Sequence, residues 1–299
     1  MTSSLALALF LGAAPAVAAS RAADVKLDTA RIEAETGLKG TLDKKDGVFK
    51  VVYPRADIKE TVAGVRITPA MGLTAWAAFT TTGRRALVMG DIVLLENQVN
   101  PVMSAALDHG LEVTALHNHF LWDSPRVMFM HIGGAGDQET LARGVGAVFA
   151  ELKKTIGAAG PTVQADIDPS RTSLDPAKLD AALGAKGRLA HGVYTIAFGL
   201  KTKIDGRELG GAMGVHTAAT FVGSEEKAVV DGDFAVRQGR LQNVLRALRH
   251  AGIDVVAIHN HMIMESPRVM FLHFWGVGKA SALAAGLRTA LDSARERQP

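Results

Sequence analysis

At 299 residues the chain is long enough for two domains of ordinary size, each with its own hydrophobic core. Apolar residues make up 48% of it and charged residues 21%, which is typical of a globular protein, and the lack of cysteine excludes disulfides, thiolate metal ligands and cysteine nucleophiles. Its 33 basic residues nearly balance 30 acidic ones, and no basic stripe is interleaved with aromatic residues, so we expect no nucleic-acid partner.

The N-terminal segment has the pattern of a signal peptide. Residues 5–18 form an apolar run that ends in Ala16-Val17-Ala18, an A-x-A cleavage pattern. The run is too short to span a bilayer and no second apolar stretch follows, so we expect no stable membrane insertion. We therefore predict a signal peptide over 1–18, a mature chain that starts near Ala19, and a periplasmic or secreted protein. The alternative is an apolar first helix of a cytosolic protein, because no Lys or Arg precedes the run.

Two segments of the chain repeat each other. Residues 71–153 align with residues 213–295 without a gap, at a constant offset of 142. We therefore predict two homologous domains, 24–156 and 176–297, since internal repeats of this kind mark duplicated structural units. The stretch between them, 157–175, is rich in Gly, Pro, Asp and Ser and is predicted to be a linker.

The first copy shows a regular succession of strand and helix patterns. Apolar or alternating runs predict strands at 74–79, 85–95, 111–120 and 125–134, and helical spacing predicts helices at 100–110 and 137–153. The order β-β-α-β-β-α is typical of an α+β fold in which helices cover one face of an antiparallel sheet. We expect the second copy to repeat this order, and the two tandem domains to pack around a pseudo-twofold axis.

Each copy carries the same histidine-rich hairpin, H-N-H followed by S-P-R-V-M-F-x-H. Alternate residues of a strand point to one face, so His117 and His119 share a face. With a turn centred on Pro125, His119 also lies directly opposite His131 on that face. The second copy repeats the pattern around Pro267, with His259, His261 and His273.

Three imidazoles on one patch are what a three-His metal site requires, with a fourth position left for water, a carboxylate or a ligand. The sequence thus predicts two pseudo-symmetric metal sites. The prediction depends on the register, because a slip of one residue would turn His131 to the other face. Two alternatives stay open: half-buried histidines that hydrogen-bond to each other and to Asn118 or Asn260, and histidines that act in acid–base or ligand chemistry without a metal.

Zinc is the expected metal, because it is the usual ion of histidine-rich sites in a chain without cysteine. Copper is the alternative, since thioethers favour copper(I) and five methionines lie in or beside the hairpins: Met128, Met130, Met262, Met264 and Met270. The pleat places Met128 and Met130 on the face opposite the histidines, which favours zinc over copper.

Asp123 and Glu265 are equivalent carboxylates beside the two turns. Each is a candidate fourth ligand, or a base that acts on metal-bound water, and they are the candidate catalytic residues of a metal-dependent hydrolase. A turn-capping role is the alternative for Asp123, because Asp before Ser-Pro suits a turn.

Arg126 and Arg268 follow the two prolines and are candidate ligand-binding residues that would clamp an anionic ligand. The alternative is an internal ion pair with Asp91 and Asp233, the acidic residues that match in type and position outside the hairpins. Of these two roles, the internal ion pair is favoured.

The duplicated H-N-H…S-P-R-V-M-F-x-H motif behind a signal sequence resembles the LppY/LpqO family of secreted bacterial proteins, over almost the whole mature chain. The resemblance implies an exported protein with a duplicated domain, and it implies no activity. Unlike the lipoprotein members, this chain has no cysteine to carry a lipid, so it would be free in the periplasm or the medium.

These features together predict an exported metal-binding protein with two three-His sites, which could serve a metal-dependent hydrolase. The rival is a non-enzymatic binding module that uses the hairpins and the two arginines to hold an anionic small molecule or an envelope partner. Trp275 replaces Gly133 and Met264 replaces Trp122 between the copies, so the two sites need not be equivalent.

Overall fold

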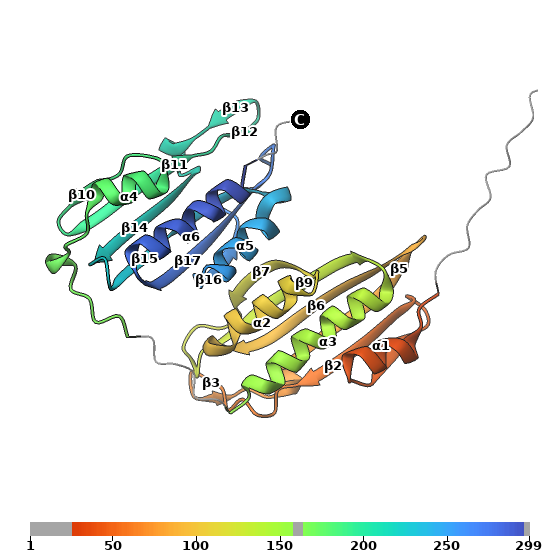
Figure 1. Ribbon diagram of the computed structural model, residues 1–299. Helices are drawn as coiled ribbons and strands as arrows, with labels where there is room; N and C mark the ends of the chain where they lie inside the picture. Colours follow the sequence, from red (N-terminus) through yellow and green to blue (C-terminus); the bar gives the residue numbers. More distant parts are fainter. Residues whose placement is uncertain (1–25, 158–163, 296–299) are drawn as a thin grey trace, which may run out of the picture.

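The computed structural model describes residues 26–157 and 164–295 (Figure 1). The predicted signal peptide, 1–18, and the predicted mature start at Ala19 lie outside the described residues. So do the first residues of the first predicted domain, part of the predicted linker and the last residues of the second domain. Within the described ranges, no helix is long and apolar enough to cross a membrane.

The two copies share one antiparallel sheet of 12 strands. Its order is β1-β2-β5-β6-β9-β7-β16-β17-β15-β14-β11-β10, with six strands from each copy in mirrored order. The first copy contributes β1 (Gly40–Asp43), β2 (Val48–Pro54), β5 (Thr74–Thr82), β6 (Arg85–Leu95), β7 (Glu112–Asn118) and β9 (Val127–Gly136). The second contributes β10 (Arg188–Ala190), β11 (Val193–Gly199), β14 (His216–Gly223), β15 (Ala228–Arg237), β16 (Asp254–His259) and β17 (Val269–Gly278).

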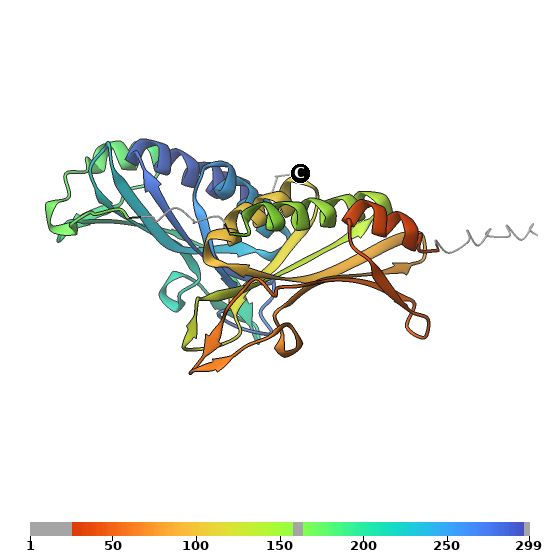
Figure 2. The same ribbon diagram turned by 90° about the horizontal axis from the view of Figure 1, so that it is seen from below.

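Six α-helices of the described chain cover one face of this sheet (Figure 2). They are α1 (Thr29–Thr36), α2 (Glu96–Asp108), α3 (Gln138–Thr155), α4 (Pro176–Leu183), α5 (Leu241–His250) and α6 (Ala280–Ser293), with short 3-10 helices η1 (Pro69–Met71), η2 (Pro169–Arg171), η3 (Gly211–Met213) and η4 (Gln238–Arg240). Helix α3 buries Leu141, Val145 and Val148, spaced for one helical face, and β5 buries alternate residues such as Ala77 and Phe79. The core therefore lies between the helices and the sheet.

Two small flaps project from the other face of the sheet, here called the open face (Figure 2). The first flap, residues 61–66 and 120–126, contains β3 (Thr61–Val62), β4 (Val65–Arg66) and β8 (Asp123–Ser124). The second flap, residues 202–209 and 262–268, contains β12 (Thr202–Ile204) and β13 (Arg207–Leu209) and is bridged to Ser266. The flaps are equivalent parts of the two copies, because the same offset of 142 relates them.

The copies meet at β7 and β16, the two central strands of the sheet. Leu116 pairs with Ile258, which is its own equivalent in the other copy. Asp108 and His250 are likewise equivalent positions, and His250 Nε2 lies 3.0 Å from an Asp108 carboxylate oxygen. A surface that contacts its own equivalent is the mark of a twofold relation. The two copies are therefore related by a pseudo-twofold axis between β7 and β16.

Two side-chain amides form hydrogen bonds across the junction between the two copies. The Asn100 amide accepts a hydrogen bond from the Val255 N–H (2.9 Å) and donates one to the Val255 carbonyl (3.3 Å). Its equivalent, Gln242, makes the same two bonds to Val113, both at 2.9 Å. Each amide thus satisfies the backbone of the opposite copy beside the axis.

Asn100→Ala should lower the free energy of unfolding by about 1–3 kcal/mol, because it leaves the backbone of the buried Val255 without partners. Urea denaturation at neutral pH measures the loss. Gln242→Ala should cost a similar amount, while Asn243→Ala, at an exposed position of the same helix, serves as the control. Equal stability of the Asn100 variant and the wild type would contradict the role of this amide.

The observed element order is longer than the predicted β-β-α-β-β-α. Each copy begins with a helix and two strands that the prediction left out, and the flap strands interrupt the rest. Helix α2 begins at Glu96, four residues before the predicted start at 100. The Gln98 side chain accepts a hydrogen bond from the Leu95 N–H (3.0 Å), which satisfies a backbone donor at this earlier start.

Candidate metal centre

Strands β6, β9 and β7 lie side by side and bring polar side chains to the open face. Asp91 of β6 pairs directly with His131 of β9, and His131 pairs directly with Ala115 of β7. Directly paired residues point to the same face of a sheet. Ile132, the chain neighbour of His131, is buried under the helices, so Asp91 and His131 lie on the open face, together with His117.

The predicted pairing of His119 with His131 is wrong. Strand β7 ends at Asn118, so His119 lies just beyond it, and His131 pairs with Ala115, four residues from the predicted partner. The flap residues take up the length that the prediction assigned to the strands. Because the displacement is an even number of residues, it leaves each side chain on its predicted face.

The three imidazoles of the first copy form one cluster. The Nε2 atoms of His117 and His131 are 3.1 Å apart. The His119 ring lies 5.3 Å from the His117 ring, between centroids, and is stacked on Phe129 at 3.3 Å. The Asp91 Oδ1 atom is buried and has no hydrogen-bond partner among the described residues. The patch thus combines three imidazoles with an unused carboxylate oxygen.

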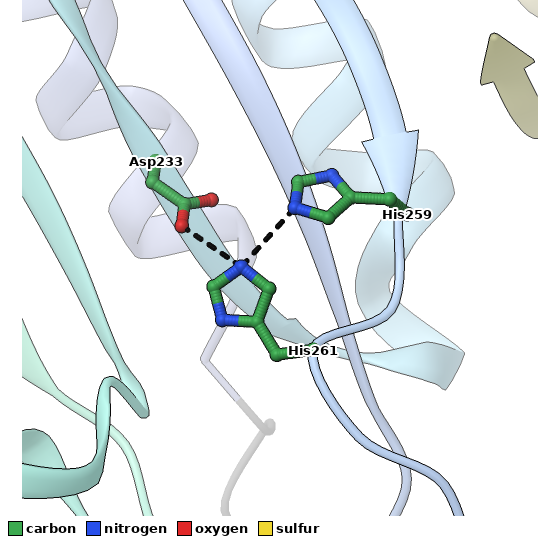
Figure 3. Close-up of side chains that lie close together, drawn as sticks. All are labelled: Asp233, His259 and His261. Carbon is green, nitrogen blue, oxygen red and sulfur yellow. Dashed lines mark hydrogen bonds and ion pairs between the residues drawn. The ribbon is translucent and has the colours of Figure 1, made fainter.

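The second copy repeats this cluster and adds a direct carboxylate contact (Figure 3). His261 Nε2 lies 3.1 Å from His259 Nε2 and 3.2 Å from Asp233 Oδ2. One possible ligand atom from each of these three residues lies within 4.8 Å of the other two. The His273 ring is 4.8 Å from the His259 ring, and the His261 ring is stacked on Phe271 at 3.5 Å. Two histidines and an aspartate therefore converge in the second copy, and His273 lies beside them.

Burial favours the neutral form of one histidine in each cluster. Burial lowers the pKa of His119; Asp91 opposes this effect, and the neighbouring histidines add to it. Burial also lowers the pKa of His259; His273 adds to the effect, and Asp233 opposes it. A lowered pKa keeps an imidazole neutral at neutral pH, and the neutral ring is the form that binds metals.

The predicted ion pairs of Arg126 with Asp91 and of Arg268 with Asp233 are wrong. Arg126 instead lies 3.7 Å from Glu96, with both side chains exposed. In the part of the chain that the structure describes, Arg268 has no ion pair. The register of the sheet carries the two aspartates to the histidines, so they are site residues that the sequence analysis missed.

The sequence does hold a signal for these aspartates, the Gly-Asp pair that occurs at 90–91 and again at 232–233. A Cβ atom at Gly90 would lie 2.7 Å from the Trp76 carbonyl oxygen and 2.9 Å from the Ile132 side chain. The equivalent Gly232 is as closely surrounded. The repeated pair therefore marks a tightly packed point of the sheet, directly beside the histidines.

Asp123 and Glu265 contact the backbone of their own turns. The Asp123 carboxylate accepts a hydrogen bond from the Val127 N–H (2.9 Å), and the Glu265 carboxylate accepts one from the Val269 N–H (3.1 Å). The Asp123 contact matches the turn-capping alternative for this residue. The catalytic role of the two carboxylates and the ligand-binding role of the two arginines stay predictions.

The fold and the repeated cluster define a tandem duplication of one mixed α/β domain. The family model described as Domain of Unknown Function (DUF1259) matches residues 30–151 and, a second time, residues 177–293. These matches cover more than half of the chain, so the protein belongs to this family, and they confirm the predicted duplication. No curated protein and no solved structure matches the chain.

Proposed function

We propose that the protein binds one metal ion in each copy, through three histidines and an aspartate. The ligands would be Asp91, His117, His119 and His131 in the first copy, and Asp233, His259, His261 and His273 in the second. The observation that carries the proposal is the 3.1 Å separation of two Nε2 atoms in each copy. Nitrogens that share a zinc ion, each at about 2.0–2.1 Å from it, lie roughly 3–3.5 Å apart.

The unpartnered atoms of the clusters favour a metal over a purely structural network. Buried polar atoms of a structural cluster are nearly always hydrogen-bonded. Among the described residues, Asp91 Oδ1, Asp233 Oδ1 and His259 Nδ1 are buried without a partner. A bound cation would provide the partner that the two carboxylate oxygens lack.

Zinc suits this set of three imidazoles and one carboxylate, and we propose it ahead of copper. Copper(I) would favour thioether ligands, but Met130 is fully buried in the core. When bound, zinc would supply Lewis-acid activation of water, which is the chemistry of a metal-dependent hydrolase. Asp123 and Glu265 each hold one carboxylate oxygen on a backbone N–H, so the second oxygen of each is the one that would act as a base in this chemistry.

We propose further that the protein is exported to the periplasm or secreted, as its A-x-A pattern and its resemblance to the LppY/LpqO proteins suggest.

A second candidate function is non-enzymatic binding of an anionic small molecule or an envelope component. It is supported by the exposure of Arg126 and Arg268, the second of which has no ion-pair partner among the described residues.

Wild-type protein purified without a histidine tag, loaded with zinc and desalted, should hold about two ions per chain, measured by elemental mass spectrometry. Asp91→Asn with Asp233→Asn should weaken binding, because the amide oxygen carries no charge. The control, Asp123→Asn with Glu265→Gln, should keep the stoichiometry, since these carboxylates contact the backbone. A wild type that takes up neither zinc nor copper would rule out the metal-binding function.

A further inference from the structure

Two pairs of large apolar residues stand out from the open side of the molecule. Each pair lies a few residues beyond the end of a histidine strand, at the tip of a flap, and the pairs are equivalent in the two copies. Their exposed fractions are high: Leu121 65%, Trp122 80%, Ile263 72% and Met264 86%. Side chains of this size and polarity are normally buried, so such exposure at two equivalent tips points to a contact surface.

Two of these residues, Trp122 and Met264, have an uncommon backbone conformation. Trp122 has a φ of 62° and Met264 a φ of 69°, both in the left-handed region. Large residues are disfavoured there, where Gly, Asn or Asp is usual. Both copies nevertheless place a large apolar side chain at this position. The flap conformation is thus one that displays an apolar residue at each tip.

The charges around the tips are mostly basic. In the first flap the exposed charged side chains are Arg66 and Arg126. In the second flap Lys203, Arg207 and Arg268 are exposed, together with Asp205 and Glu208. Glu208 is itself paired with Lys201 at 2.7 Å. Arg66, Arg207 and Arg268 have no ion pair among the described residues, whereas Arg126 lies near Glu96. Apolar tips flanked by such arginines complement a lipid surface, whose interior is apolar and whose headgroups can be anionic.

We propose that the open face docks on an anionic lipid surface through Leu121-Trp122 and Ile263-Met264. Both flaps project on the same side, away from the helices, so both tips can meet one plane (Figure 2). Tryptophan is favoured at the membrane interface, and nearby arginines are attracted to anionic headgroups. Two separate tips can both insert into a lipid surface, because lipids are fluid and can rearrange around tips at any spacing. The inference does not depend on a bound metal.

The test is co-sedimentation of the wild type with phosphatidylcholine vesicles, with and without phosphatidylglycerol. Chelator is present throughout, so that no metal can bridge lipid phosphate to the histidines. The wild type should bind the anionic vesicles, and added salt should weaken the binding. Replacing all four tip residues with Ser should weaken it at least about tenfold. Arg126→Ala with Arg268→Ala should weaken binding to anionic vesicles alone.

The matched control is Leu42→Ser with Leu189→Ser, two exposed leucines on β1 and β10 at the outer edges of the sheet. This control should bind like the wild type. In a Trp76→Phe, Trp275→Phe background, Trp122 emission should move to the blue when anionic vesicles are added. If the wild type binds neither kind of vesicle, the lipid proposal is wrong, and the open face would instead have a protein as its candidate partner. Binding that survives the tip substitutions, or an unchanged Trp122 emission, would overturn the lipid proposal equally.

Discussion

The double variant His117→Ala, His259→Ala should bind no zinc, and each single variant should bind about half as much as the wild type. Each of these histidines approaches a second imidazole Nε2 atom to 3.1 Å, so each removal takes away one of the two closest ligands. The control, His109→Ala with His250→Ala, removes histidines at the C-terminal ends of α2 and α5 and should leave the stoichiometry unchanged.

Thermal unfolding provides a second measurement of the same prediction. A ligand at about 100 times its dissociation constant adds roughly 2.7 kcal/mol to the native state. Chelator should therefore lower the Tm of the wild type and leave that of the double variant unchanged. We expect the second copy to bind more tightly, because its carboxylate already contacts His261. Identical zinc contents in the double variant and the wild type would show that these histidines are not ligands.

Glu60→Thr should raise the free energy of unfolding by about 1–3 kcal/mol at neutral pH. Glu60 directly precedes the first flap in the chain and is fully buried. Neither of its carboxylate oxygens has a hydrogen-bond partner among the described residues. The equivalent residue of the second copy is Thr202, whose hydroxyl donates a hydrogen bond to the Pro267 carbonyl (2.7 Å). The variant gives the first copy the polar contact that the second copy already has.

The gain should grow with pH. Burial raises the pKa of Glu60 above its ordinary value of 4.5, and the nearby Asp123 carboxylate raises it further. The folded state therefore holds this proton more firmly than the unfolded state, so the wild type loses stability as the pH rises from 4.5 through the raised pKa. Urea denaturation across this range measures the difference. Glu112→Thr, at an exposed position of β7, is the control, and a pH-independent difference would contradict the explanation.

The duplication, the central elements and the shared face of the histidines are predictable from the sequence, because each depends on a local pattern. In a strand such as β5, every second residue is buried, so the positions of the residues along the chain predict which side chains face the core. The face of a side chain depends only on whether its position is odd or even along the strand. For that reason the histidine cluster persists although the predicted register is wrong.

The aspartates of the site were not predictable in the same way. Asp91 reaches His131 only because β6 lies next to β9, and that pairing joins strands separated by a helix and by β7. No local pattern encodes which strands become neighbours. The first flap was a second feature that could not be predicted. Its strand β8 pairs with β3, which is distant in the chain, so β7 and β9 are not joined by the tight turn that was predicted.

The pairing of Leu116 with Ile258 has a consequence for how the molecule can diversify. A homodimer built on such a contact would carry every substitution twice, once in each subunit. Covalent fusion of the halves removes that constraint, so a mutation alters one half and leaves the other as it was. Gly133 and Trp275 already differ in this way at equivalent positions of β9 and β17. One half is thereby free to specialise while its counterpart preserves the ancestral arrangement.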